Sequence, residues 1–183
     1  RIDFAIATGS QSLFEGHSLL PCYKWHRHVV VPKGHPLAKI KAPTLKQLAA
    51  HPIITYVFGF TGPSSLMEIF AKEGLVPNVA LTARDADVIK TYVRLGLGIG
   101  IVASMAIDPK EDADLVQIDT SHLFPTHTTW IGFRRGGLLR KYQLDFVQLF
   151  APHLTKRVIE RAAGAATQAD VDELVKGIEL PVR

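Results

Sequence analysis

Three hydroxyl side chains and a Gly-Pro pair lie together in the stretch FGFTGPSSL, residues 58–66. Thr61, Ser64 and Ser65 come just before an apolar run with helical spacing, so the stretch predicts the start of a helix. The N–H groups of a first helical turn, with hydroxyls beside them, can bind an anion. The same residues can also cap a helix without any ligand. Taken alone, the residues favour capping and leave anion binding open.

A fourth hydroxyl ends the first apolar run, DFAIAT, residues 3–8. This run is short and has no helical period, which predicts a strand buried on both faces. Its last residue is Thr8, and polar residues follow. In open α/β sheets, ligands bind beyond the carboxyl ends of strands. Thr8 and the turn around Thr61 are therefore the candidate binding positions.

Patterns for catalysis or metal binding are weak in this sequence. No nucleophile-elbow, phosphate-loop or zinc-protease motif occurs. His26 and His28 fall on one face of a predicted strand, but no carboxylate or cysteine with ligand spacing accompanies them. Asp85 and Asp87 fall at a predicted helix start, where they complement the helix dipole. The sequence predicts no enzyme, no metal site and no cofactor.

The glycines of GLGIGI, residues 96–101, superficially match part of a dinucleotide fingerprint. The fingerprint requires a strand, then the glycine turn, then a helix. Here the predicted helix comes first and the strand second. The motif therefore predicts a helix stop followed by close backbone packing.

The elements that must position these residues alternate between strands and helices. Strands are predicted at residues 3–8, 25–31, 53–58, 79–83, 98–104, 115–118 and 126–135. Helices are predicted at residues 45–50, 63–74, 85–96, 141–154 and, as one or more helices of a tail, 156–176. Such alternation predicts an α/β fold with largely parallel sheets. Two long segments, 23–31 and 128–133, fit crossovers between two lobes.

Two of these helices have defined apolar faces. The helix at 85–96 is expected to turn Val88, Ile89, Tyr92 and Val93 inward. The helix at 141–154 carries Tyr142, Phe146, Leu149 and Phe150 on one face.

The composition limits the size and the class of the folded protein. The chain has 183 residues, of which 47% are apolar and 21% charged, which predicts a globular domain or a pair of small lobes. The net charge of +4 is too scattered for a nucleic-acid surface, and no run approaches a membrane span. Cys22 is the single cysteine, so it is expected to be a buried apolar side chain in a reducing compartment.

Tyr23 and Trp25 share one face of a predicted crossover strand. Such a pair is usually part of a core. It could equally line a cleft, because both rings carry a polar edge.

The segments VVVPKGHPLA (29–38) and DADVIKTYVRLGLGIGIVAS (85–104) resemble the effector-binding domain of LysR-type transcriptional regulators. With DFAIAT, TYVFGFTG, TTWIGFRR and FAPHLT, the chain is similar to the CysB-like branch, which regulates sulphur assimilation and cysteine biosynthesis. The resemblance implies a periplasmic-binding-protein-like type 2 fold, in which two Rossmann-like lobes are joined by two crossover strands. The expected divisions are the remainder of lobe I, lobe II, the return to lobe I and a helical tail, at residues 1–21, 22–123, 124–153 and 154–183. The first lobe is expected to be incomplete in this fragment.

The same resemblance implies the ligand and the site. The effector would be N-acetylserine, or sulfate or thiosulfate, held in the cleft between the lobes. Thr8, Thr61 and Gly62 match anion-binding positions of the family, and Tyr23 and Trp25 match positions beside the cleft.

The resemblance also implies the wider protein. Promoter DNA would be bound by a winged helix-turn-helix upstream of Arg1, and the cytoplasmic protein would form dimers or tetramers without a membrane partner. The alternative is a periplasmic-type solute-binding protein for a small anion, which has the same architecture.

Overall fold

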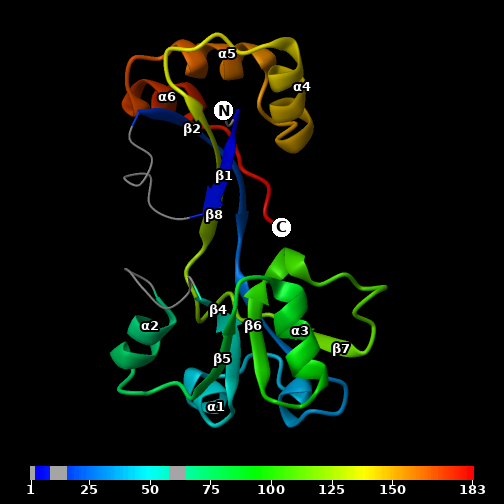
Figure 1. The fold of residues 1–183 in the computed structure, drawn as a ribbon. Helices are drawn as coiled ribbons and strands as arrows, with labels where there is room; N and C mark the ends of the chain where they lie inside the picture. The colour runs from blue at the N-terminus through cyan, green and yellow to red at the C-terminus, as the bar shows by residue number, and fades with distance from the viewer. Residues whose placement is uncertain (1–2, 9–15, 58–64) are drawn as a thin grey trace. The chain divides into compact units, whose positions relative to one another are not determined.

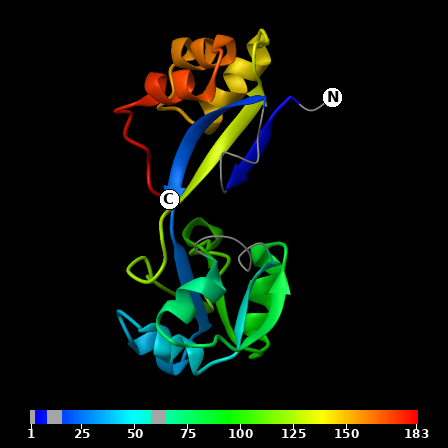
Figure 2. The same ribbon diagram turned by 90° about the vertical axis from the view of Figure 1, so that its left-hand side faces the viewer.

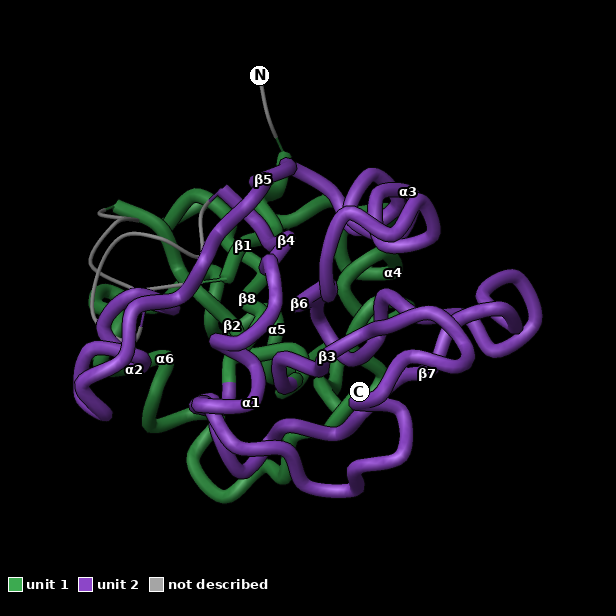
Figure 3. Tube along the Cα trace, turned by 90° about the horizontal axis from the view of Figure 1, so that it is seen from below, with its two compact units in different colours: residues 1–25, 127–183 green, residues 26–126 purple. Residues whose placement is uncertain are grey.

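The computed structural model describes residues 3–8, 16–57 and 65–183. The chain divides into two compact units, coloured separately in Figure 3. Unit 1 comprises residues 1–25 and 127–183, and unit 2 comprises residues 26–126. The chain therefore leaves unit 1 after Trp25 and returns to it at His127.

Unit 1 contains a three-stranded antiparallel sheet in the order β1 (Ala5–Thr8), β8 (His127–Arg134), β2 (His17–Trp25). The long strands β2 and β8 run side by side (Figures 1 and 2). Their register shifts between Pro21 and Tyr23, where β2 has an extra residue.

Three helices pack on this sheet: α4 (Lys141–Phe150), α5 (Lys156–Gly164) and α6 (Gln168–Val175). Thr155 caps α5 by accepting a hydrogen bond from the Val158 N–H, and Thr167 forms a capping box with Asp170 in α6. The prediction of one or more helices in the tail is confirmed. The core of unit 1 is made by Leu20, Cys22, Ile131, Phe133, Val147, Ala151, Leu154, Ile159, Ala162, Ala163 and Val171.

Unit 2 contains a five-stranded sheet. Its strands, in spatial order, are β5 (Val79–Ala83), β4 (Ile53–Tyr56), β6 (Ile99–Ala103), β3 (Arg27–Pro32) and β7 (Leu115–Ile118). The strand β4 is parallel to β5 and β6, whereas β3 is antiparallel to β6 and β7. The carboxyl ends of β4, β5 and β6 therefore meet at one edge of the sheet.

Helices cover both faces of this sheet. One face packs against α1 (Leu45–Ala49), α2 (Leu66–Lys72) and the short 3-10 helix η2 (Pro36–Lys39). The other packs against α3 (Ala86–Arg94), through the fully buried Ile89 and Val93. A second 3-10 turn, η4 (Ser104–Ala106), follows β6.

Three strand predictions need correction. Residues 25–31 are not one strand, because β2 ends at Trp25 and β3 begins at Arg27. The strand β2 was missed because Pro21 interrupts it and the residues 18–22 are all buried, which removes the alternation that marks a strand. The first strand is not buried on both faces, since Ile6 and Thr8 are exposed and β1 pairs only with β8 among the described residues.

The expectation of largely parallel sheets holds only for β4 with its two neighbours. The sheet of unit 1 is entirely antiparallel. The chain folds a whole unit between β2 and β8, so β8 returns beside β2 in the opposite direction without a crossover helix.

The helix starts follow local sequence signals. Asp85 caps α3 as predicted, accepting a hydrogen bond from the Val88 N–H at 2.9 Å. Ser65 caps α2, accepting from the Glu68 N–H at 3.2 Å. Gly74 follows the end of α2 with a φ of 67°, which agrees with the predicted stop.

One residue of the predicted inward face of α3 is exposed, and so is most of the apolar face of α4. Val88 of α3 is 39% exposed rather than turned inward. The α4 residues Tyr142, Phe146 and Leu149 are also exposed. The residues that α4 buries against the rest of unit 1 are Gln143 and Val147. The polar Gln143 can be buried because its side chain donates to Asp3 at 2.9 Å and accepts from the Arg140 N–H at 2.7 Å.

The GLGIGI segment is a helix stop with close packing, as predicted. Gly96 has a φ of 75° directly after α3. A Cβ at Gly98 would lie 2.3 Å from the carbonyl oxygen of Pro52, and one at Gly100 would lie 2.5 Å from Val30. The first glycine ends the helix, and the other two let neighbouring strands and helices approach.

Candidate ligand-binding site

Two threonine hydroxyls are in contact on the sheet of unit 1. Thr8 is the last residue of β1 and is exposed, as its position at a strand end predicts. Its Oγ1 lies 3.3 Å from the Oγ1 of Thr129, which is directly opposite in the register of β1 and β8. Thr129 is only 5% exposed. The exposed residue Thr8 therefore shares a hydroxyl contact with the buried Thr129.

Trp25 also contacts Thr129. Its indole Nε1–H donates to the Oγ1 of Thr129 at 3.1 Å, and the ring stacks on His127 with centroids 4.5 Å apart. An indole N–H can only donate, so the oxygen of Thr129 accepts from Trp25, while either hydroxyl can donate in the contact between Thr8 and Thr129; when Thr129 donates, the Thr8 proton stays available for another partner. Thr8 can then donate its proton to a further acceptor, such as an anionic oxygen.

Tyr23 makes different contacts. Its ring lies 5.6 Å from that of Phe150 in α4, and the guanidinium of Arg183 lies 5.3 Å above it. Trp25 and Thr8 thus belong to one hydrogen-bonded set, whereas Tyr23 packs between a helix and the end of the chain. A position beside a cleft stays a prediction for both aromatic residues.

The two other predicted ligand residues, Thr61 and Gly62, lie outside the described residues. Their contact with an anion stays a prediction.

The sequence interpretation missed Thr129. The only signal for it was a pair of threonines in the alternating run THTTWIGF. Nothing in the sequence showed that the second of these would pair with Thr8, which is 121 residues away.

His26 lies between β2 and β3, and His28 lies in β3, where it contacts a carboxylate and an amide. His28 Nε2 lies 3.2 Å from Asp119 Oδ1, and its Nδ1 lies 2.9 Å from the side-chain amide of Gln117. Burial lowers the pKa of His28, although Asp119 opposes that shift. Within residues 3–8, 16–57 and 65–183, no group of three or more His, Cys, Asp or Glu residues could hold a metal ion.

Cys22 is also inert as a nucleophile. It is 1% exposed in the core of unit 1, and burial raises the pKa of its thiol to about 12. The thiol is therefore neutral at physiological pH, which agrees with its predicted role as a small apolar side chain.

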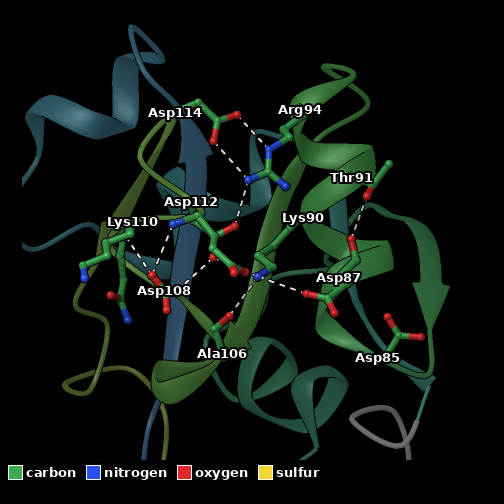
Figure 4. Close-up of polar contacts among 12 residues, drawn as sticks. Asp85, Asp87, Lys90, Thr91, Arg94, Ala106, Asp108, Lys110, Asp112 and Asp114 are labelled. Atoms are coloured by element: carbon green, nitrogen blue, oxygen red, sulfur yellow. Dashed lines mark hydrogen bonds and ion pairs between the residues drawn. The ribbon is translucent and has the colours of Figure 1, made fainter.

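An ionic network ties α3 to the loop before β7 in unit 2 (Figure 4). The ammonium of Lys90 lies 2.8 Å from Asp112 Oδ2 and 3.0 Å from Asp87, and it donates to the Ala106 carbonyl at 3.1 Å. Arg94 binds Asp112 at 2.8 Å and Asp114 at 2.7 Å. Both Lys90 and Asp112 are nearly inaccessible, and every charge in the network has a partner. This network is therefore structural rather than a ligand site.

The network keeps Asp112 ionised. Burial alone would raise the pKa of Asp112, but hydrogen bonds from Lys90, the Asp108 N–H and Arg94 outweigh burial and lower it from 3.8 to about 2. The bonds that hold the carboxylate are shown in Figure 4.

Comparison with known proteins places this fold among the substrate- and cofactor-binding domains of transcriptional regulators. The solved structure of the cofactor-binding domain of the Cbl transcriptional regulator matches with a TM-score of 0.78 and 41% identity, over 88% of this chain and 71% of that chain. The family described as the LysR substrate binding domain matches residues 1–155, and the chain belongs to this family.

Curated relatives give the same result. The chain is 49% identical over 182 residues to the HTH-type transcriptional regulator CysB of Haemophilus influenzae, covering 100% of this chain and 56% of the relative. It is 50% identical over 157 residues to the regulator SsuR of Burkholderia cenocepacia, covering 86% of this chain and 51% of the relative. The predicted resemblance to the CysB-like branch and the two-lobed fold class are confirmed.

The chain spans about half the length of these curated relatives. Because they carry the names of transcriptional regulators, the solute-binding alternative is not favoured. No helix among the described residues is long and apolar enough to cross a membrane.

Proposed function

We propose that this chain senses an effector for a LysR-type regulator of sulphur assimilation and cysteine biosynthesis. A small anion would bind and change how the complete regulator engages promoter DNA. The observation that carries the proposal is the exposed residue Thr8 at a strand end, whose hydroxyl contacts Thr129, which in turn accepts a hydrogen bond from Trp25. The identity to CysB, SsuR and Cbl proteins supports the assignment to sulphur metabolism.

The ligand in this proposal is N-acetylserine or a related inducer, or sulfate or thiosulfate. The proposed site is the inter-lobe cleft that the resemblance to LysR-type regulators implies. Thr8 and Thr61 donate through their hydroxyls and Gly62 through its backbone N–H, with Tyr23 and Trp25 nearby. The anion can shift the regulator only by binding one lobe arrangement more tightly than another, so no chemical step and no cofactor is required.

The rest of the proposal concerns partners. A winged helix-turn-helix elsewhere in the protein binds the promoter in the cytoplasm, and the regulator works as a dimer or tetramer.

Calorimetric titration of the full-length protein tests the ligand directly. N-acetylserine, sulfate and thiosulfate are each titrated, with the binding of promoter DNA followed by fluorescence anisotropy in the same buffers. Heat from at least one anion, with a change in DNA affinity, supports the proposal. If the folded protein gives no heat with any of them, the ligand assignment is wrong.

Thr8→Ala is expected to weaken anion binding by about 1 to 3 kcal/mol, because a hydrogen bond to a charged oxygen is lost. Thr61→Ala is expected to cost a similar amount. Calorimetric dissociation constants for the full-length protein measure both effects. Thr128→Ala is the matched control, since Thr128 is the neighbour of Thr129 on β8 and faces the opposite side of the sheet. Equal affinities for Thr8→Ala and the control would show that Thr8 does not contact the anion.

Self-association is expected to depend on the exposed apolar face of α4 and the residues before it. Leu138 is fully exposed and Leu149 is 81% exposed, and such side chains on a surface favour contact with another chain. The double substitution Leu138→Glu/Leu149→Glu should shift the protein toward a smaller species in sedimentation velocity. Val76→Glu is the control, because Val76 is equally exposed in unit 2. An unchanged sedimentation coefficient for the double variant would place the interface elsewhere.

A further inference from the structure

Arg27 is a buried cation with no anionic partner in the described residues. It is the first residue of β3 and is only 6% exposed. Its Nη1 is buried and has no hydrogen-bond partner. Among the described residues, the side chain that favours its charge is Tyr56, a neutral phenol, and no described carboxylate forms an ion pair with the guanidinium.

Lys90 is the informative comparison, because it lies in the same unit and is also 6% exposed. Its ammonium contacts two carboxylates and a backbone carbonyl. Where a buried cation in this unit has a structural role, the chain thus supplies its counter-charges. For Arg27, residues 3–8, 16–57 and 65–183 supply none.

The missing counter-charge matters because of the chemistry of arginine. Burying an unpaired charge costs several kcal/mol, and most groups avoid that cost by becoming neutral. A guanidinium cannot lose its proton under physiological conditions, so Arg27 stays charged although burial lowers its pKa. A counter-anion from outside the described chain would remove the deficit.

The position of Arg27 is held by its backbone. It is paired with Ala103 at the end of β6, and its carbonyl accepts a hydrogen bond from Thr120 Oγ1 at 2.8 Å. The Ala103 N–H in turn donates to the hydroxyl of Tyr56, the last residue of β4. Arg27 therefore lies at the edge where the parallel strands of unit 2 end, which is the edge that binds ligands in open α/β sheets.

We propose that the guanidinium of Arg27 binds the anionic group of a small ligand, either a carboxylate or a sulfate-type oxyanion. The planar fork of a guanidinium can bind two oxygens of either group at once. This inference rests on the proposed function, because it names the residue that would neutralise the charge of that effector. Hydroxyl and amide donors such as Thr8 can orient an anion but carry no positive charge.

Arg27→Met tests the proposal, with Arg157→Met as a control that removes an exposed positive charge from α5 of unit 1. Sulfate and N-acetylserine are titrated calorimetrically into the full-length protein and both variants. Arg27→Met should bind sulfate roughly 10- to 100-fold more weakly, as expected for a lost hydrogen-bonded charge pair. The control should bind as the unmodified protein does.

Thermal unfolding gives a second readout that does not depend on N-acetylserine. Sulfate should raise the unfolding midpoint of the unmodified protein above that in sodium chloride of equal ionic strength, and Arg27→Met should abolish the difference. In sulfate-free buffer Arg27→Met should unfold at the same temperature or higher, because an unpaired buried charge has been removed. If that variant does not fold, guanidinium NMR signals of the unmodified protein are followed as sulfate is added, and Arg27 should shift.

The outcomes separate this inference from the proposed function. If N-acetylserine binds equally to the unmodified protein and Arg27→Met, the inference is wrong and the proposed function stands. If N-acetylserine gives no heat while sulfate stabilises the protein through Arg27, the proposed inducer is wrong and the inference stands. If sulfate changes neither the unfolding midpoint nor the Arg27 signals, Arg27 does not bind an anion and the inference is wrong.

Discussion

Asp112→Ala is expected to destabilise unit 2 by about 3 to 5 kcal/mol, because it leaves the ammonium of Lys90 buried without its closest counter-charge. Lys90 would retain Asp87, whose side chain is 90% exposed, and a single carbonyl. The loop before β7 would also lose the contact between Arg94 and Asp112. Urea denaturation at neutral pH measures the change in the free energy of unfolding.

Two further variants separate a charge effect from a packing effect. Asp114→Ala removes only an exposed partner of Arg94, so its effect should be much smaller. Lys90→Met/Asp112→Leu removes both buried charges and should recover most of the stability. If Asp112→Ala is no worse than Asp114→Ala, the buried pair does not stabilise the unit.

Acid should abolish the contribution of Asp112. Its pKa in the folded protein is lowered from 3.8 to about 2, so the carboxylate stabilises the fold above the unfolded value and stops doing so as the pH falls through about 2. The unfolding free energies of the unmodified protein and Asp112→Ala should therefore converge between pH 4 and pH 2.

Gly98→Ala is expected to cost about 3 kcal/mol, at the upper end of the range for overpacking a core. The added Cβ would lie 2.3 Å from the carbonyl oxygen of Pro52, which is backbone and cannot rotate away. That oxygen also accepts the Ile99 N–H at 2.8 Å where β4 and β6 begin to pair. Relieving the clash therefore breaks the pairing. Urea denaturation of the full-length protein gives the change.

Gly164→Ala is the control for this substitution. Gly164 is the last residue of α5, and a Cβ there would meet nothing within 4 Å. Because alanine favours helix more than glycine, this variant should be as stable as the unmodified protein or slightly more stable. A similar loss for both variants would mean that glycine flexibility, rather than the contact with Pro52, explains the result.

The sequence predicted features that depend on neighbouring residues. Asp85 as the cap of α3 and Gly74 as the stop of α2 are set within a single turn of helix, so residue type and spacing are sufficient. The burial of Cys22 followed from its character and its apolar neighbours.

Features that join distant segments could not be predicted in this way. Thr8 was a candidate because it ends a strand, but its partner Thr129 is 121 residues away and is fixed only by the register of β1 and β8. The sequence interpretation did not single out Arg27, whose burial follows from the packing of unit 2. The exposed face of α4 looked like a core face, because sequence periodicity shows that an apolar face exists but not what covers it.

The pairing of Trp25 with His127 has a mechanical consequence. These rings stack, and each belongs to the residue from which the polypeptide leaves or re-enters unit 1. Both strands that lead to unit 2 are thus anchored at a single aromatic pair. A displacement of the Thr8 hydroxyl would be transmitted through Thr129 to the indole of Trp25. It would therefore reach the two connecting strands, β2 and β8, together.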